Sequence, residues 1–479
     1  MRADALAPTA SQASRFQIWI ARFAHPLLLS QAVLLLSLLV FDRPLIRGDA
    51  VAYFMWTASI GRDFDMDLSN QAERFGPVNT YMAVYNPATG RYVSVFAWGT
   101  GLLLQPAFWI ARGLDQLPSF RVNDDWFIAL QAYPFAYSLM GMLQVNALTL
   151  ASAAMVYAIA RGQGVSRVAA ACGGLAVVWG TPFYYYSTVQ PLYAHAPATF
   201  VHTLAICLAV WAVKLPEARQ RWWHSLLAGL AFGLATLTRW QLALSLVIFA
   251  VWFASQRRWQ AAGFLIAGWA LIAWHVPYTF NWMFGAPFAI PAEAVENGGG
   301  FLSWPRYLIP VLFSADRGFL IWSPIAALGA LGLFALGRRS PGLALALGAV
   351  VAAQVLVNAG VRDWYAGESF GLRRLTEVYP ALAVGVAALL SAAEVASRRW
   401  WLSITYGAVI LTALYGLFMV VASLIFHYFT DPSFGFVTTP PPPTALNVLM
   451  FFLSPPRLDL VWPMMEHHFG PWAWTWPGP

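Results

Sequence analysis

The sequence predicts an all-α protein that crosses a membrane many times. Of its 479 residues, 59% are hydrophobic and only 10% are charged, whereas a soluble domain carries about a quarter charged residues. Apolar runs near the length that crosses a bilayer recur along the chain. The net charge of +7 could indicate nucleic-acid binding, but the basic residues form no stripe and lie in short segments between the apolar runs. That distribution is typical of topology signals and argues against a nucleic-acid partner.

Eleven apolar ranges are the predicted transmembrane segments. They are residues 24–41, 132–160, 165–183, 195–213, 224–238, 240–256, 260–280, 318–337, 342–360, 376–396 and 400–427. A further run near 93–112 is interrupted by glycines and Pro106, and we place it as a re-entrant or interfacial helix. No small-residue cleavage site follows the first range, so it is interpreted as a retained helix and not as a signal peptide.

Basic residues then decide the orientation. If 93–112 does not span, the pairs Arg257/Arg258, Arg338/Arg339 and Arg398/Arg399 all fall on the same side as the N-terminus. Basic residues in short loops favour the cytoplasm. We therefore predict a cytoplasmic N-terminus and an extracytoplasmic C-terminus.

This topology places four segments outside, at residues 42–126, 281–317, 361–372 and 427–479. The second contains Gly298–Gly300, a predicted hinge. No internal repeat is evident. We predict one transmembrane catalytic domain over 1–427, which includes outer loops 42–126 and 281–317, and a Pro/Trp-rich extracytoplasmic tail over 428–479.

Asp49 is the strongest local signal for chemistry. It follows the first predicted span in the motif Gly48-Asp49, four residues before Tyr53, which is a secondary candidate for the site. A carboxylate at an apolar boundary has its charged form disfavoured, which moves its pKa toward the range useful for a general base. The alternative is a helix cap with a solvated charge. Asp65 lies in a nearby acidic segment and is a secondary candidate, for which loop capping is the preferred interpretation.

Four arginines are predicted at the outer surface, against the usual charge preference of that side. They are Arg239, Arg317, Arg373 and Arg374. This mismatch indicates a bound anion, and guanidinium groups suit phosphate. The alternative for each arginine is structural pairing with Asp316, Asp363, Glu368 or Glu377. Glu368 is retained as a secondary candidate for the site.

Other polar residues give weaker signals. His195, at the outer end of a predicted span, is a secondary candidate, although a single histidine there is more often structural. Glu466-His467-His468 has no partners at metal-ligand spacing. No cofactor is therefore predicted, and a divalent metal is left open but is not indicated by the sequence. There is no Gly-rich phosphate loop or nucleophile elbow.

Several motifs together resemble the C superfamily of membrane glycosyltransferases (GT-C). They are Gly48-Asp49 with the aromatic that follows, Leu237-Thr238-Arg239, Ser323-Pro324 and Gly371-Leu372-Arg373-Arg374. This superfamily includes protein O-mannosyltransferases and the bacterial transferases that add aminoarabinose or galacturonic acid to lipopolysaccharide. The chain departs from the mannosyl enzymes because Asp49 is followed by Ala50 and not by Glu, which argues against mannosyl transfer to protein.

The resemblance implies a polytopic GT-C helical bundle in a bacterial inner membrane. It implies an inverting enzyme that takes a sugar from a polyprenyl monophosphate and gives it to an envelope glycan, lipid or protein. Asp49 would deprotonate the acceptor, and Arg239, Arg373, Arg374 and Arg317 would bind the donor phosphate. Two alternatives remain at this point: a flippase or transporter for lipid-linked sugars, and a polysaccharide polymerase or ligase with a polyprenyl diphosphate donor.

Overall fold

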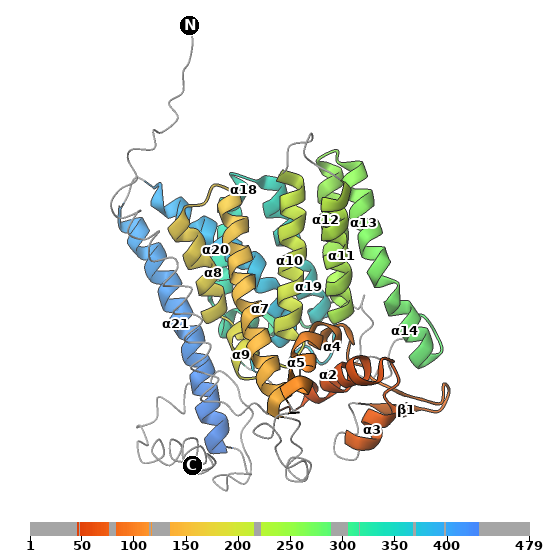
Figure 1. The fold of residues 1–479 in the computed structure, drawn as a ribbon. Coiled ribbons are helices and arrows are strands. Elements are labelled where there is room, and N and C mark those ends of the chain that lie inside the picture. The colour runs from red at the N-terminus through yellow and green to blue at the C-terminus, as the bar shows by residue number, and fades with distance from the viewer. Residues whose placement is uncertain are drawn as a thin grey trace.

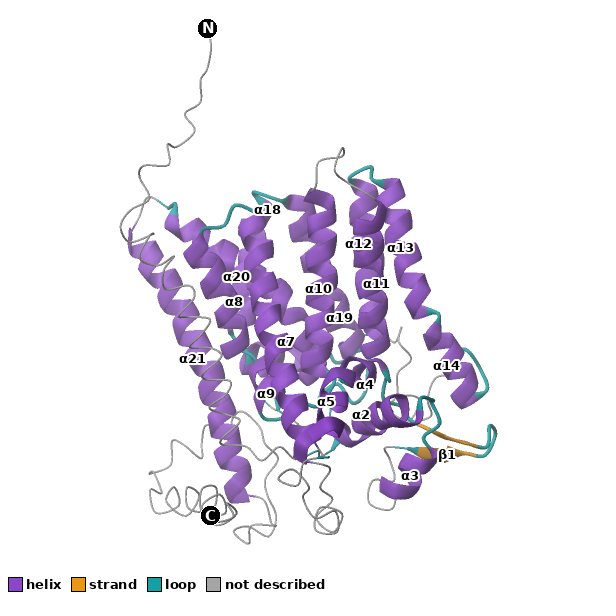
Figure 2. Cartoon of the chain, in the orientation of Figure 1, coloured by secondary structure: helices purple, strands orange, loops and turns teal. Residues whose placement is uncertain are grey.

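The computed structural model describes residues 46, 48–75, 83–114, 116, 135–214, 222–288, 305–315, 317–366, 370–396 and 399–430. The predicted span 24–41, the segment Gly298–Gly300, Glu368 and the tail after Thr430 lie outside these residues. The described residues form a bundle of long helices with a layer of short elements at one end (Figures 1 and 2).

The long helices coincide with the predicted spans. They are α7 (Phe135–Gly162), α8 (Arg167–Trp179), α10 (His195–Lys214), α11 (Trp222–Thr238), α12 (Ala243–Ser255), α13 (Trp259–Ala273), α18 (Ile325–Gly337), α19 (Pro341–Ala359), α20 (Tyr379–Glu394) and α21 (Arg399–Thr430). The helical membrane bundle is therefore confirmed. Among the described residues, six helices are long and apolar enough to cross a membrane, or seven if one bent pair counts as a span. That number is lower than the eleven predicted.

Breaks in the helices account for part of this difference. The range 165–183 divides into α8 and α9 (Pro182–Thr188), which are bent by 68°. Thr181 caps α9 by accepting a hydrogen bond from Phe183 N at 3.2 Å, and Pro182 opens that helix. The range 318–337 divides at Ser323-Pro324 into α17 (Phe319–Trp322) and α18.

Further short elements flank the long helices. They are α14 (His275–Phe284), α16 (Leu308–Phe313) and the 3-10 turns η5 (Trp240–Leu242) and η6 (Arg373–Val378). Each 3-10 turn leads directly into a long helix, η5 into α12 and η6 into α20. The two turns therefore carry polar side chains to the ends of the bundle.

The layer at one end consists of elements from the first predicted outer loop, residues 42–126. They are α2 (Asp49–Ala58), the π-helical turn η1 (Ser59–Asp63), α3 (Ser69–Phe75), β1 (Val84–Asn86), β2 (Arg91–Val93), α4 (Gly99–Leu103) and α5 (Gln105–Leu114). Both α4 and α5 are too short to span, in agreement with the prediction for 93–112. The antiparallel β1–β2 hairpin was not expected in an all-α protein.

The helices approach one another closely where small residues face each other. A Cβ added at Gly332 of α18 would lie 1.9 Å from the backbone oxygen of Gly385 in α20. Contact at this distance requires glycine, and small residues allow such backbone approach in membrane bundles.

In Figure 1 the loops that join α7 to α8, α12 to α13 and α18 to α19 lie at the end opposite α2, α4 and α5.

Candidate active site

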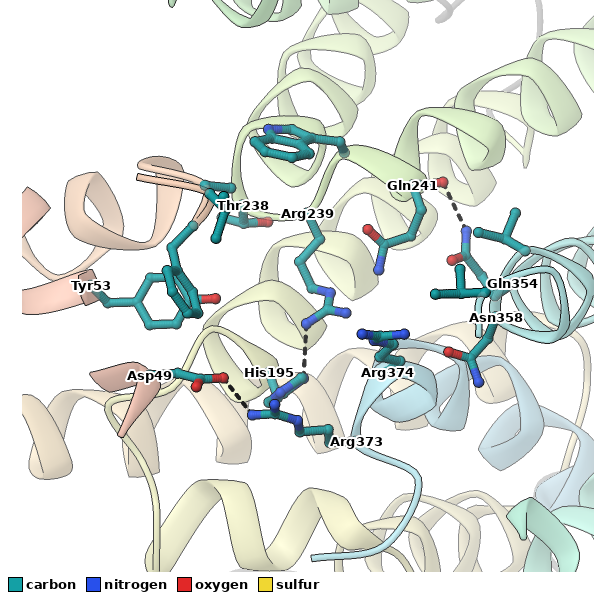
Figure 3. A pocket seen from close by; sticks show the side chains of 16 residues that line it. Asp49, Tyr53, His195, Thr238, Arg239, Gln241, Gln354, Asn358, Arg373 and Arg374 are labelled. Carbon is teal, nitrogen blue, oxygen red and sulfur yellow. Dashed lines mark hydrogen bonds and ion pairs between the residues drawn. The ribbon is translucent and has the colours of Figure 1, made fainter. Parts of the chain in front are cut away.

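A cavity of about 360 Å³ lies where the outer-loop layer meets the ends of the long helices. Its walls come from the start of α2, residues 95–97, the start of α10, the α11–η5 junction, the end of α19 and the start of η6. Figure 3 shows the charged and amide side chains that enter this space. Segments distant in sequence thus form a single site.

Asp49 begins α2 and lines the cavity. The residue before it, Gly48, has φ 53° and ψ −137°, which side chains other than hydrogen rarely allow. A Cβ at Gly48 would also lie 2.4 Å from the hydroxyl oxygen of Tyr193. Gly48 is therefore required twice, for its backbone angles and for the contact with Tyr193. The Gly-Asp pair of the sequence is explained by this turn, which directs the carboxylate inward.

Three arginines line the cavity, and each pairs with a different carboxylate. Arg373 donates to Asp49. Arg239 Nε lies 3.1 Å from Glu377 Oε1. Arg374 Nη2 lies 2.7 Å from Asp363 Oδ2.

The carboxylates differ in position. Asp49 lines the cavity, whereas Glu377 and Asp363 do not, so they support their arginines from outside it. The guanidinium groups of Arg239 and Arg374 are therefore fixed by carboxylates that do not line the cavity.

Arg239 is held by several groups at once. Its Nη1 lies 3.1 Å from His195 Nδ1, and that nitrogen lies 3.5 Å from Glu377 Oε1. With the Gln241 amide oriented so that its oxygen faces Arg239, this oxygen accepts from Nε and Nη2 at 2.9 Å each. These contacts leave Arg239 little rotational freedom. A guanidinium fixed in advance is suited to bind an anion, because less conformational entropy is lost on binding.

Two tyrosines adjoin the carboxylate. Tyr53 lines the cavity. Burial, followed by the charge of Asp49, raises the pKa of Tyr53 above its usual value. The same two causes, in the same order, raise the pKa of Tyr193. Both phenols therefore remain protonated at neutral pH and are available as hydrogen-bond donors.

The structure brings together most of the residues singled out from the sequence. Asp49, Arg239, Arg373 and Arg374 line one cavity with the secondary candidates Tyr53 and His195. Their roles stay predictions.

Two other candidates are placed elsewhere, and Glu368 lies outside the described residues. Arg317 does not line the cavity: it is buried beside Trp322, with its guanidinium carbon 5.5 Å from the indole centroid. Its place after α16 directs it into the packing around α17. Asp65 Oδ1 accepts from Ser59 Oγ at 2.9 Å and from Asp67 N at 3.2 Å, which is a loop-capping arrangement.

Sequence reasoning did not select Glu377 or the amides of the cavity. Glu377 was considered only as a structural partner, yet an acid near the start of an apolar span is itself a functional signal. Gln354 and Asn358 lie within the apolar range 342–360, where their spacing of four residues was the available signal. Among the described residues, no three His, Cys, Asp or Glu side chains are grouped so as to hold a metal ion.

Comparisons with known proteins agree with this fold. Residues 120–296 match the dolichyl-phosphate-mannose-protein mannosyltransferase family. The structure resembles that of ArnT from Cupriavidus metallidurans bound to undecaprenyl phosphate, with 17% identity, a TM-score of 0.51, and coverage of 91% of this chain and 70% of that one. An Archaeoglobus fulgidus oligosaccharyltransferase is also similar, with 13% identity, a TM-score of 0.48, and coverage of 89% and 60%. No curated protein matches the sequence significantly.

The family match covers residues 120–296, which is less than half of the chain. The chain is a polytopic helical membrane protein whose fold is similar to that of ArnT. The matched segment contains His195, Arg239 and Gln241, whereas Asp49 and the α19 wall lie outside it.

Proposed function

We propose that this protein is a glycosyltransferase that moves a sugar from a polyprenyl monophosphate to an acceptor hydroxyl, with inversion at the anomeric carbon. The transfer takes place at the extracytoplasmic face of a bacterial inner membrane, on an envelope glycan, lipid or protein. The observation that carries this proposal is the single cavity in which one carboxylate meets three guanidinium groups. A base and an anion site are the two parts that such a displacement needs.

The chemistry requires one displacement. Asp49 takes the proton of the acceptor hydroxyl while that oxygen forms a bond to the anomeric carbon. The bond between this carbon and the phosphate oxygen breaks on the opposite face, so the configuration inverts. The leaving phosphate is a stable anion and needs charge stabilisation more than a proton. Arg239, Arg373 and Arg374 supply that stabilisation.

The ion pair of Asp49 with Arg373 connects the two parts of the site. A phosphate on Arg373 would compete with Asp49 for the same guanidinium. Donor binding would then reduce the stabilisation of the Asp49 charge and make this carboxylate a stronger base. Donor binding would thus prepare the base for the acceptor.

The donor class is supported by charge and by likeness. Guanidinium forks match phosphate oxygens, and the ArnT structure with a similar fold was solved with undecaprenyl phosphate. A flippase could bind the same lipid, so binding alone does not separate the two functions.

The deciding assay uses purified protein in detergent with polyprenyl-phosphate sugars and envelope acceptors. A transferase forms a glycosidic product there, whereas a flippase has no compartments to work between. Preference for a diphosphate lipid would assign the polymerase or ligase class. Absence of transfer with every lipid-linked sugar, together with transport of the lipid in vesicles, would overturn the proposal.

Orientation has its own test. The short loops that contain or border arginines join α7 to α8, α12 to α13 and α18 to α19. They lie at the end of the bundle opposite the cavity (Figure 1). If these loops are cytoplasmic, as basic loops usually are, the cavity faces outward. Reporter fusions after Arg161, Arg258 and Arg339 should report cytoplasm, and fusions at Asn297 and Pro479 should report the outside. A cytoplasmic C-terminus would contradict this orientation.

A further inference from the structure

One wall of the cavity is formed by the C-terminal part of α19. Gln354 and Asn358 are four residues apart, so they lie on the same face of this helix. Both line the cavity, and both are only 3% exposed. Val357 and Val361 lie beside them on the same wall. Figure 3 shows the two amides on α19, across the arginines from Asp49 and Tyr53.

The orientation of each amide is fixed by its nitrogen. Gln354 Nε2 donates to the backbone oxygen of Gln241 at 2.9 Å, and Asn358 Nδ2 donates to the backbone oxygen of Trp364 at 3.0 Å. These are the only side-chain hydrogen bonds that the two residues form within the described part of the chain. The side-chain oxygens of Gln354 and Asn358 are therefore the amide atoms that have no hydrogen-bond partner among the described residues. Asn358 Oδ1 is buried and accepts no hydrogen bond from the described residues.

A buried carbonyl oxygen without a donor is unfavourable, so it indicates a ligand that supplies one. Phosphate is unsuitable here because its oxygens are also acceptors. A uronic acid is unsuitable for the same reason, because its carboxylate oxygens are acceptors and would face the amide oxygens without a donor between them.

The ammonium group of an amino sugar can donate to these oxygens, but three arginines and one carboxylate line the cavity, so a further positive charge is unfavourable there. Hydroxyl groups are the remaining donors.

The rest of the wall suits a carbohydrate as well. Trp240 also lines the cavity and is packed edge to face against Phe280, with ring centroids 4.6 Å apart. A sugar presents apolar C–H faces as well as hydroxyls. Ligand sites commonly combine such apolar surface with a few placed polar groups. The volume of about 360 Å³ is at the small end of the range for ligand sites.

We propose that Gln354 and Asn358 form a subsite that accepts hydrogen bonds from the hydroxyl groups of a neutral sugar on the lipid donor. The inference rests on the proposed function and narrows its substrate to donors with an uncharged, hydroxyl-rich sugar. The same hydroxyl chemistry could come from a glycan acceptor, and the experiment separates these two sources.

The test measures binding to the full-length protein in detergent, without turnover. The probes are undecaprenyl phosphate and its mannosyl, glucosyl, galactosyl, aminoarabinosyl and galacturonosyl forms. For the wild type, at least one neutral hexose should increase affinity over the bare lipid by about tenfold, as expected for two hydrogen bonds. Neither charged sugar should exceed the best neutral one.

Two variants remove the acceptors separately, Asn358→Leu and Gln354→Met. Each should reduce the gain from the hexose by about three- to tenfold and leave binding of the bare lipid unchanged. Within one variant, the ratio of the affinity for the hexosyl lipid to the affinity for the bare lipid does not depend on the fraction of protein that is folded. Leu356→Met is the matched control, since Leu356 lies on the same turn and is 46% exposed; it should keep the wild-type ratio.

Three results would overturn the subsite. They are an unchanged ratio in both variants, tighter binding of a charged sugar than of every neutral one, and, in a separate transfer assay, an increase in the acceptor KM alone, which would assign the wall to the acceptor. The proposed function fails separately: if the hexose gain is present and depends on both amides, yet no product forms, transfer is wrong and the subsite stands.

Discussion

The arginines that line the cavity and those at the opposite end of the helical bundle have different partners. At the cavity end, Arg239, Arg373 and Arg374 extend into the protein and pair with carboxylates. At the other end, cations meet backbone carbonyls. Arg339 Nη1 lies 3.3 Å from the backbone oxygen of Gly164, and Arg258 Nη1 lies 3.4 Å from that of Ala212.

The difference separates structural arginines from candidate functional ones. Cations that bind carbonyls near helix C-termini satisfy groups that the helix leaves unpaired and also interact favourably with its dipole. Such contacts need no particular partner. A buried ion pair loses the hydration of both charges and is weak evidence for stability. The three pairs around the cavity are largely or partly buried, so they indicate a role in binding or catalysis.

The largest expected effect comes from the carboxylate of the cavity. Asp49→Asn keeps the shape of the side chain and removes its basicity, so turnover should fall by at least about a hundredfold. Binding of undecaprenyl phosphate should persist or strengthen, because Arg373 is released from its ion pair. Asp65→Asn is the control with the same chemical change outside the cavity, and it should stay near wild-type activity. Near wild-type turnover in Asp49→Asn would make Asp49 structural.

Replacing cavity arginines by lysine tests the comparison between the two ends directly. Arg239→Lys, Arg373→Lys and Arg374→Lys keep the charge but lose the planar fork. A lost charge-assisted contact weakens binding by about 1.5–3 kcal/mol, or one to two decades in the Kd for undecaprenyl phosphate. Arg258→Lys and Arg339→Lys, at the opposite end, should leave that Kd unchanged. Equal effects at both ends would remove the distinction.

A smaller effect is expected at the turn before Asp49. Gly48→Ala must adopt an unfavourable φ and bring a methyl group against Tyr193, and strained backbone costs about 1–3 kcal/mol. Activity should fall, with a lower thermal midpoint. Tyr193→Phe in the Gly48→Ala background removes the closest contact and should restore part of the loss. A fully active Gly48→Ala enzyme would show that the turn does not position the carboxylate.

The smallest effect on binding is expected for Arg317, which sequence reasoning grouped with the phosphate ligands. Because it does not line the cavity, Arg317→Lys should leave the Kd for undecaprenyl phosphate unchanged. The thermal midpoint should fall modestly, since a cation–π contact is worth about 0.5–2 kcal/mol. A donor Kd weakened as much as in Arg239→Lys would place Arg317 in the site after all.

Features that depend on local interactions along the chain could be predicted from the sequence, whereas features that depend on contacts with other segments could not. The helices were found because apolar length is a local property: α10 and α19 match their predicted ranges within one residue at either end. The breaks at Thr181-Pro182 and Ser323-Pro324 were less accessible, because a proline can open, kink or end a helix according to its neighbours. The β1–β2 hairpin was missed because each strand has only three residues.

By itself the sequence determined the helical membrane architecture, the loops that carry the basic residues, and the identity of Asp49 and the arginines as candidates. These follow from composition, apolar length and charge position, which act locally along the chain. Only the tertiary structure decided which arginines share a cavity, because Arg239 and Arg317 both lie at the end of an apolar range and differ in their packing. It also decided that Glu377 supports Arg239 and that two amides of α19 present free oxygens. The contacts of Glu377 with Arg239 and of Gln354 with Gln241 join segments more than 100 residues apart, and periodicity within one segment carries no information about them.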